Sequence, residues 1–437
     1  YIMKFIIAIL LAIPTYGVSL VVLICYMIYR TKNVKKNVEA AIRFFSENPS
    51  SVGSCVEGIS YIQAYAYLSE NGVLSKSGVN FFDYSVSIEG VPYAGTLGVE
   101  PGGSLAMFTS QDMSWVEPVV EWLDNNFNSN DLHHANRITS LRDIGLDGRS
   151  QQFNFEMEYI PEQLSNCKEL EGIYLHDTKI IKIPKSLSKC KKLETLWING
   201  SYVSEIPPEL FSCPIIKSIN IINGQIIKIP FSIENATFLE DFVVEGNKIV
   251  ELPNQLFNLK NLKELSVQRN KIKNIPKDIG RLISLEYLNI SHNQIAFVPG
   301  EIFNISNLTS LRISGNFIEK IPAGLACLSK LEKIDISDNR ITEFPDELLK
   351  LRKLTEIHAA GNPFISLPDH LDNLDNLKIL GLGSFPEMEL SKNQINWINR
   401  LQSNGCTIWL HCKNFTIGND NYLNGRLQGL SATRLLN

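Results

Sequence analysis

The chain has 437 residues, of which 44% are hydrophobic, and a formal net charge of −5. That length exceeds one ordinary domain and allows a large apolar core. The mildly acidic balance gives no reason to expect nucleic acid as a partner, so we predict none.

An apolar run opens the chain. Residues 5–29 contain no charged side chain, and a helix of that length would rise about 37 Å, enough to cross a bilayer. A cleaved signal peptide is the competing interpretation, but the run is too long and lacks a small-x-small cleavage site. Behind it, apolar residues recur at helical spacing and predict an amphipathic continuation to about Asn48: Val34, Val38, Ala41, Ile42 and Phe45.

A helix of nearly 50 residues, apolar in its first half and amphipathic in its second, and starting from Tyr, is similar to the N-terminal spine of type IV pilins. The resemblance implies a helix that packs against copies of itself in a filament. The chain departs from the pilin pattern at Phe5, where pilins usually carry Glu, and at the neighbouring Lys4. Residues 1–50 are therefore predicted to be either a membrane anchor or a pilin-like spine.

The charges beside the apolar run bear on its orientation. Only Lys4 precedes the run, whereas five basic residues follow it: Arg30, Lys32, Lys35, Lys36 and Arg43. If Tyr1 is the true start, this asymmetry places the rest of the chain in the cytoplasm, and removal of a basic leader would reverse that orientation. We favour the cell surface, in a membrane or an extracellular filament, and keep a cytoplasm-facing membrane protein as the second interpretation.

Residues 51–136 read as a small α/β module. A helix is expected to start near residue 55 and to end at Gly72, and alternating strands are expected within 79–90, 94–101 and 104–110. A second helix is predicted within 114–127, with Pro118 near its first turn. This module is either a head packed on the long helix, as in pilins, or a cap for the domain that follows.

From residue 137 to 384 one pattern repeats every 23 residues. Leu285, Leu288, Ile290, Asn293 and Ile295 find equivalent residues 23 positions earlier and later. Prolines stand without a break at positions 161, 184, 207, 230, 253, 276, 299, 322, 345 and 368. A fixed period in the twenties indicates a solenoid, whose units each bury an apolar face only against their neighbours.

The pattern LxxLxLxxNxIxxxP resembles the leucine-rich-repeat family over about residues 141–382. The resemblance implies an α/β fold, a curved solenoid with a parallel sheet on its concave face. The residues indicate the same: Leu288 and Ile290 alternate as a strand facing the core, which leaves four side chains for solvent, those of Glu286, Tyr287, Asn289 and Ser291.

A buried Asn after each strand is expected to bond the open backbone groups of its own turn and of the next coil. Such residues would stack as a ladder through Asn293 and its equivalents. Thr178, Ser201 and Gly224 hold that position in the first repeats. Their backbone groups should be less well satisfied, and that end of the solenoid less regular.

The concave face is the candidate binding surface. The residue between the two core positions of each strand is predicted to point out of this face, with further side chains on either side. The candidate partner-binding residues are Tyr174, His176, Trp197, Asn199, Asn220, Asp241, Val243, Glu264, Tyr287, Asn289, Arg312, Asp335 and His358. Aromatic anchors are common at interfaces, so Tyr174 and Trp197 are expected to contribute most. The alternative is that residues 51–136 fold over this pair and bury it.

Motifs for catalysis are absent from the sequence: it holds no GxxxxGK(S/T), GxGxxG, HExxH or GxSxG. Cys167, Cys190 and Cys213 recur at a position that later repeats fill with Leu or Ile, so we interpret them as core residues, with neighbour disulfides as the alternative. We predict no cofactor and no metal site. An enzyme with a site in residues 52–135 remains the alternative.

These patterns predict four segments: the helix of 1–50, the module of 51–136, the solenoid of 137–384, and a C-terminal cap and tail of 385–437, in which residues 392–405 and the CTIWLHC that follows them form the cap. The predicted function is non-enzymatic recognition of a protein or glycan by a protein displayed on a bacterial surface. A pilin-like structural subunit, with the repeats on the outside of the filament, is the alternative. In either case the N-terminal helix would contact the membrane or copies of itself.

Overall fold

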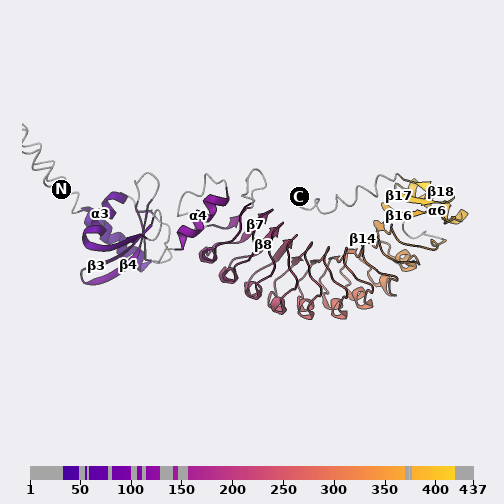
Figure 1. Ribbon diagram of the computed structural model, residues 1–437, viewed down its shortest axis with the longest axis horizontal. Coiled ribbons are helices and arrows are strands. Elements are labelled where there is room, and N and C mark those ends of the chain that lie inside the picture. The colour runs from indigo at the N-terminus through magenta and orange to yellow at the C-terminus, as the bar shows by residue number, and fades with distance from the viewer. Residues whose placement is uncertain are drawn as a thin grey trace, which may run out of the picture. The chain divides into compact units, whose positions relative to one another are not determined.

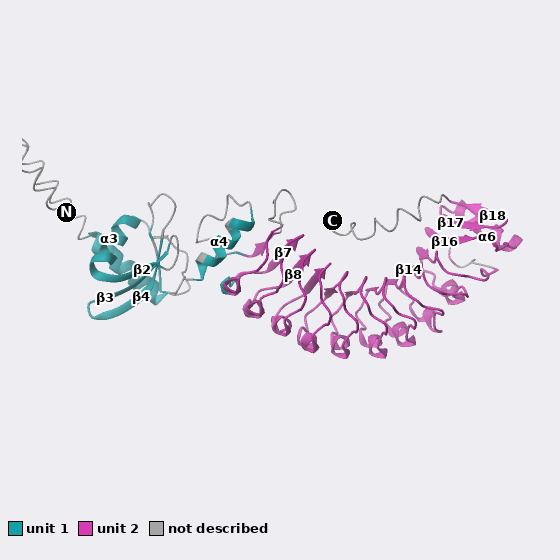
Figure 2. Cartoon of the chain, in the orientation of Figure 1, with its two compact units in different colours: residues 1–141, 166–168 teal, residues 142–165, 169–437 magenta. Residues whose placement is uncertain are grey.

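The computed structural model describes residues 33–48, 55–56, 59–76, 81–99, 106–110, 115–127, 141–145, 156–369, 374 and 376–418. The chain divides into two compact units, one of residues 1–141 with 166–168 and one of residues 142–165 with 169–437 (Figure 2). None of the helices in these ranges is both long and apolar enough to cross a membrane. The apolar run of 5–29 lies outside the described residues, so its two interpretations stay predictions.

The first unit contains a five-stranded antiparallel sheet in the order β1-β5-β4-β3-β2 (Figure 1). Its strands are β1 (Cys55–Val56), β2 (Gly72–Lys76), β3 (Phe81–Ile88), β4 (Val91–Val99) and β5 (Ala106–Thr109). The helical residues 33–47 bury the predicted apolar stripe in the same core as this sheet: Val38, Ala41, Ile42 and Phe45 cluster with side chains such as Tyr84, Leu97 and Phe108. The amphipathic helix predicted to end near Asn48 is therefore confirmed over residues 33–47.

The helix expected to start near residue 55 is shorter than predicted. Helix α3 spans Tyr61–Asn71 because Ser60 caps it: the Gln63 amide donates to Ser60 Oγ over 3.4 Å, and Ser60 N donates to Gln63 Oε1 over 3.2 Å. Cys55 and Val56 instead pair with β5 as an edge strand. The end at Gly72 and the second helix, α4 (Val116–Asn126), agree with the prediction.

The second unit is a solenoid with a 13-stranded sheet in sequential order from β6 to β18. Pairing is parallel from β6 to β17, and β18 joins β17 antiparallel. Figure 1 shows the strands along the concave side of this unit and the short 3-10 turns along its convex side. The strands are β6 (Asp143–Ile144), β7 (Gly172–His176), β8 (Thr195–Asn199), β9 (Ser218–Ile222), β10 (Asp241–Val243), β11 (Glu264–Ser266), β12 (Tyr287–Asn289), β13 (Ser310–Arg312), β14 (Lys333–Asp335), β15 (Glu356–His358), β16 (Ile379–Phe385), β17 (Thr407–Cys412) and β18 (Phe415–Ile417).

The convex turns follow the repeated prolines, which suit a segment that makes no regular backbone ladder. All of the described turns begin directly after the proline except η8, which begins after two further residues. They are η1 (Glu162–Asn166), η2 (Lys185–Lys189), η3 (Pro208–Ser212), η4 (Phe231–Asn235), η5 (Asn254–Asn258), η6 (Lys277–Arg281), η7 (Gly300–Asn304), η8 (Leu325–Cys327) and η9 (Asp346–Lys350). At the C-terminal end, α6 (Lys392–Ser403) precedes β17, within the segment that the sequence predicted as a cap.

The stacked Asn residues are confirmed, but each bonds its own turn and the preceding coil, not the next coil as predicted. Asn293 Oδ1 accepts from Ile272 N of the preceding coil (3.0 Å), while Asn293 Nδ2 donates to Val267 O of that coil and to Ile290 O of its own coil, both over 3.0 Å. At the N-terminal end, Thr178 Oγ1 has no hydrogen-bond partner. The weaker satisfaction there is confirmed, but the end is not less regular, because β7, β8 and β9 have five residues each whereas β10 to β15 have three.

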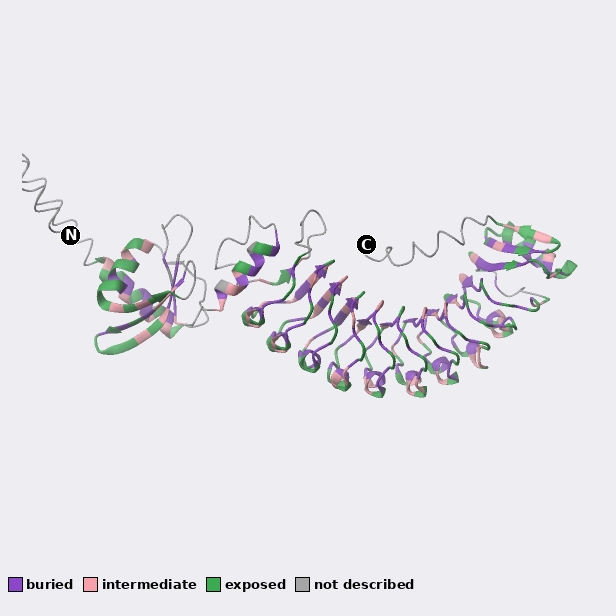
Figure 3. Cartoon of the chain, viewed as in Figure 1, coloured by how far each residue is buried: buried purple, intermediate pink, exposed green. Residues whose placement is uncertain are grey.

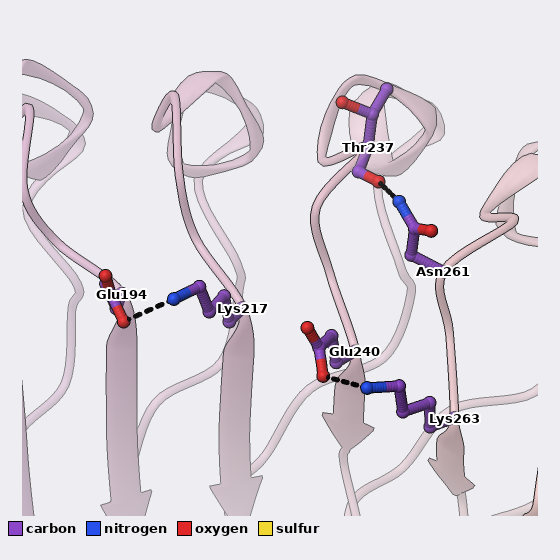
Figure 4. A network of polar contacts seen from close by, with 6 residues as sticks. All are labelled: Glu194, Lys217, Thr237, Glu240, Asn261 and Lys263. Carbon is purple, nitrogen blue, oxygen red and sulfur yellow. Dashed lines mark hydrogen bonds and ion pairs between the residues drawn. The ribbon is translucent and has the colours of Figure 1, made fainter.

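A row of alternating charge runs just before the strands: Glu194, Lys217, Glu240, Lys263 and Glu286 occupy one position in five successive coils. Lys217 Nζ lies 2.8 Å from Glu194 Oε2, and Lys263 Nζ lies 2.6 Å from Glu240 Oε2 (Figure 4). These side chains are exposed, so each pair adds little alone.

Replacing Glu240 by Lys puts three ammonium groups in adjacent coils, and like charges side by side repel. We expect a lower melting temperature in low salt and a difference that nearly disappears in about 1 M NaCl, where the Debye length is about 3 Å. Glu240→Gln is the control, which should lose the pair without adding repulsion. A decrease that does not respond to salt would contradict the electrostatic explanation.

A second row marks the turn between each strand and the Asn ladder. One residue per coil there has a positive φ, which residues other than Gly, Asn and Asp seldom adopt. The row is Asp177, Gly200, Asn223, Gly246, Arg269, His292, Gly315, Asp338 and Gly361. Each of the four glycines follows, one coil later, a residue whose side chain occupies the space that a Cβ would need. Backbone conformation favours glycine in this row, and at these four positions packing against the preceding coil leaves no room for a Cβ.

Candidate binding surface

The outward residues of the concave sheet lie in rows across the strands. Register places Tyr174 beside Trp197, Trp197 beside Asn220, and so on to His358 beside Gly381. The central row is Tyr174, Trp197, Asn220, Val243, Ser266, Asn289, Arg312, Asp335 and His358. The structure thus brings every predicted member of this row together on one face.

Several of these side chains are buried, contrary to the expectation that they face solvent. Val243 is 9% exposed, Asn289 2% and His358 6%, and Ser291 is buried as well. Neighbouring parallel strands lie only about 4.8 Å apart, so side chains from adjacent coils cover one another. Figure 3 shows buried residues along the strands. The remaining predicted site residues are half-buried.

The aromatic pair is the largest apolar feature of the N-terminal coils. The Tyr174 and Trp197 rings meet edge to face with centroids 5.4 Å apart, and Trp197 Nε1 donates to Ser218 Oγ over 3.3 Å. Burial raises the pKa of Tyr174 above its ordinary value. His176 and Asn199 are register partners and form the next row, so they flank the pair. Both rings remain half-exposed within the described structure, which suits them to contact a partner.

The central coils are polar and already linked to one another. Ser266 Oγ donates to Glu245 Oε1 over 2.5 Å, and Asn289 Nδ2 donates to Gln268 Oε1 over 2.7 Å. Asp241 and Glu264 are register partners, so their carboxylates stand in adjacent coils. These hydrogen bonds fix the side chains before any partner arrives, which lowers the entropy that binding must overcome.

Cations follow in the next coils. The Arg312 guanidinium carbon lies 5.5 Å from the centre of the Tyr287 ring, a cation–π contact. Burial raises the pKa of Tyr287, and the Glu245 and Glu264 carboxylates add to that shift while Arg312 opposes it. Tyr287 therefore stands between negative and positive parts of the face.

Farther along, Lys333 Nζ lies 2.7 Å from Glu356 Oε1, and His358 Nε2 lies 3.6 Å from Glu356 Oε2. Desolvation tends to raise the pKa of Glu356, but these two partners leave it below its ordinary value.

Trp409 was not among the predicted site residues. This half-buried residue on β17 continues the central row after Gly381. It stands 28 positions after Gly381 (409 − 381) because α6 interrupts the 23-residue spacing. Only the alternation of CTIWLHC would have indicated a further strand of the same sheet.

The cysteines of the array pack as core residues. Cys167, Cys190 and Cys213 are buried, and burial raises the pKa of Cys190 to about 11 and of Cys213 to about 12. In the part of the chain that the structure describes, no group of three His, Cys, Asp or Glu side chains is placed to hold a metal ion.

Comparison with known proteins identifies the repeats. Models of the leucine rich repeat match residues 238–295 and 306–364, a two-copy model matches 283–327, and a model of the BspA type leucine rich repeat region matches 149–233. No curated protein matches the chain.

Solved structures show the same fold. An internalin from Listeria monocytogenes is 26% identical, with a TM-score of 0.51, over 61% of this chain and 74% of its own. The leucine-rich-repeat ectodomain of a membrane receptor kinase from Arabidopsis thaliana, solved with Casparian strip integrity factor 2, is 21% identical, with a TM-score of 0.50, over 62% of this chain and 32% of its own. From the parallel sheet, the Asn ladder and these matches, we conclude that residues 149–364 of the chain belong to the leucine-rich-repeat family.

Proposed function

We propose that the chain is a non-enzymatic recognition protein, displayed at the cell surface, whose concave sheet binds a protein or glycan partner. The main support is the half-exposed aromatic pair of Tyr174 and Trp197, held edge to face on a rigid sheet. Rigid aromatic side chains lose little entropy on binding and often dominate interfaces. The leucine-rich-repeat fold and its likeness to an internalin agree with a role in protein interaction.

Changing both Tyr174 and Trp197 to Ala should weaken binding about thirtyfold, since truncation of a central aromatic anchor costs about 2 kcal/mol or more. The probes are a displayed library of random 16-residue peptides and a glycan array, with affinities of the selected binders measured by calorimetry. Phe231→Ala is the matched control, because Phe231 is 69% exposed on the convex turn η4. It should leave affinity unchanged.

Melting curves of the same variants separate a binding role from a structural one. A double variant that melts much earlier yet binds as tightly as the parent would assign the pair to the fold and contradict the proposal. Screening hydrolase substrates with added metals tests the enzyme alternative. Turnover that disappears on changing residues 52–135 would contradict the non-enzymatic role.

A filament subunit is the second candidate. The helical residues 33–47 bury their apolar stripe in the core of an antiparallel sheet, the arrangement that the resemblance to pilins implies. Electron microscopy of sheared cell-surface material, with N-terminal sequencing of the chain it contains, tests this candidate. Filaments that contain the chain would support it, whereas recovery only from membranes would exclude it.

A further inference from the structure

The outward side chains of β7, β8 and β9 form an uncharged surface on the concave sheet. Buried Ile and Leu residues alternate in these strands with residues that point out of the sheet. None of the outward residues is Asp, Glu, Lys or Arg. We call this surface the aromatic zone, and its side chains are those of Tyr174, His176, Thr195, Trp197, Asn199, Ser218, Asn220 and Ile222.

Both aromatic rings of the zone are held in place by their surroundings. The Tyr174 ring occupies the space that a Cβ at Gly172 would need, so it lies against its own strand as well as against Trp197. Trp197 in turn donates its hydrogen bond to Ser218. A ligand that packs against these rings therefore loses little free energy in ordering them. The faces of aromatic rings carry a partial negative charge, which attracts the weakly positive C–H groups of a sugar ring.

Side-chain amides lie next to Trp197. Asn220 is its register partner on β9, and Asn199 follows it on β8. Asn223 Nδ2 donates to Asn199 Oδ1 over 3.4 Å, so a third amide stands beside the second. An amide both donates and accepts hydrogen bonds, as a sugar hydroxyl does. A purely apolar ligand would remove water from these groups without replacing its hydrogen bonds, which is unfavourable.

The charges around the zone favour a neutral ligand. Asp143 lies beside Gly172 in the register of β6, and Asp177 directly follows β7, and both side chains are exposed. These carboxylates accept hydrogen bonds from hydroxyl groups but repel an anion. Farther along the face, charges of opposite sign stand together, since Arg312 lies beside Asp335 in the register of β13 and β14. A ligand that carries a net charge therefore finds no surface of a single opposite sign there.

We propose that the aromatic zone binds a neutral oligosaccharide. One sugar ring packs against Tyr174 and Trp197. Hydroxyl groups of the same or the next sugar bond the amides of Asn199, Asn220 and Asn223. Three strands at a spacing of about 4.8 Å make the zone about 10 Å across, which accommodates a short stretch of linked sugars. This inference rests on the proposed function of the concave face and narrows the partner to one class.

The first test is a glycan array that carries neutral and acidic oligosaccharides, probed with the full-length protein. The parent should retain neutral glycans in preference to acidic ones. Calorimetry with the tightest neutral glycan should give an affinity about tenfold or more weaker for Trp197→Ala, because the aromatic anchor is lost. Trp197→Phe keeps an aromatic ring and should retain most of the affinity. Tyr202→Ala is the matched control, because Tyr202 is 55% exposed in the same coil but lies outside the strands, and it should bind as the parent does.

Two further measurements address the polar part of the site. Asn199→Asp keeps the shape of the side chain but removes both of its donors, so it should bind the same neutral glycan about fivefold more weakly. The affinity of the parent should be equal in low salt and in about 1 M NaCl, since screening acts only between charges. Melting curves of all variants confirm that they are folded.

Binders found only in the peptide library, and lost with the double change of Tyr174 and Trp197 to Ala, would overturn this inference and leave the proposed function standing. A preference for acidic glycans, or an affinity that falls in high salt, would likewise overturn the inference alone. Glycans and peptides that bind the double variant as tightly as the parent would overturn both, and so would the absence of any binder from the array and the library.

Discussion

Asn293→Ala is expected to lower the free energy of unfolding by about 3 kcal/mol or more. The change removes the acceptor of Ile272 N, and this buried amide is left without a partner at a cost of about 1–3 kcal/mol. Val267 O and Ile290 O each lose one of two donors and keep the other, from Asn270 and Asn316, so each lost hydrogen bond adds about 1 kcal/mol. Urea denaturation of the variant measures the total effect.

Hydrogen exchange then locates that effect. The Ile272 amide should lose protection far more than amides several coils away, because each repeat contacts only its neighbours. Asn274→Ala is the matched control, since Asn274 is exposed and lies in the same coil as Ile272. If the Asn293 and Asn274 variants unfold at the same urea concentration, the ladder does not stabilise the solenoid.

Gly246→Val is expected to destabilise the solenoid by about 2–4 kcal/mol. Gly246 has a φ of +63°, which is strained for a β-branched residue, at about 1–3 kcal/mol. In addition, its new Cβ would overlap Asn223 Oδ1 of the preceding coil. Thermal and urea unfolding of the variant measure the sum of the two effects.

A double-mutant cycle separates strain from overlap. Asn223→Gly removes the obstructing side chain and itself tolerates the φ of +57° found at position 223. The double variant Asn223→Gly, Gly246→Val should therefore be more stable than the sum of the single changes implies, while the strain at position 246 remains. Strict additivity would mean that the Asn223 side chain moves aside at no cost.

The fold of the repeat array could be predicted because its sequence pattern recurs at a fixed period. Leu288 and Ile290 are buried as their alternation indicated, and Asn293 bonds the coil before it. The same pattern of one strand and one turn recurs ten times, so the apolar face of each repeat can be identified from the sequence. The first unit carries no such repetition: the two-residue strand β1 was interpreted as helix, because its pairing with β5 depends on residues about 50 positions away.

The surface was harder to predict than the core. The sequence spacing predicted that Asn289 and His358 lie on the concave face. It did not predict that they are buried, because their burial depends on contacts between coils. Asn289 is covered as its amide bonds Gln268, and His358 as it meets Glu356. Arg312 makes a cation–π contact with Tyr287, which lies 25 positions earlier in the chain (312 − 287). No local sequence pattern predicts a contact at that spacing.

The alternating row of Glu194, Lys217, Glu240, Lys263 and Glu286 also constrains how the array can change in length. Removing the single coil that carries Lys217 would bring Glu194 beside Glu240, although the leucines would still match. Removing two coils together brings Glu194 beside Lys263 and restores an attractive pair. The core residues still match after removal of any number of 23-residue units. The charges between residues 194 and 286 form attractive pairs only when an even number of units is removed. In this stretch the unit of gene duplication or loss that preserves the surface is a pair of coils.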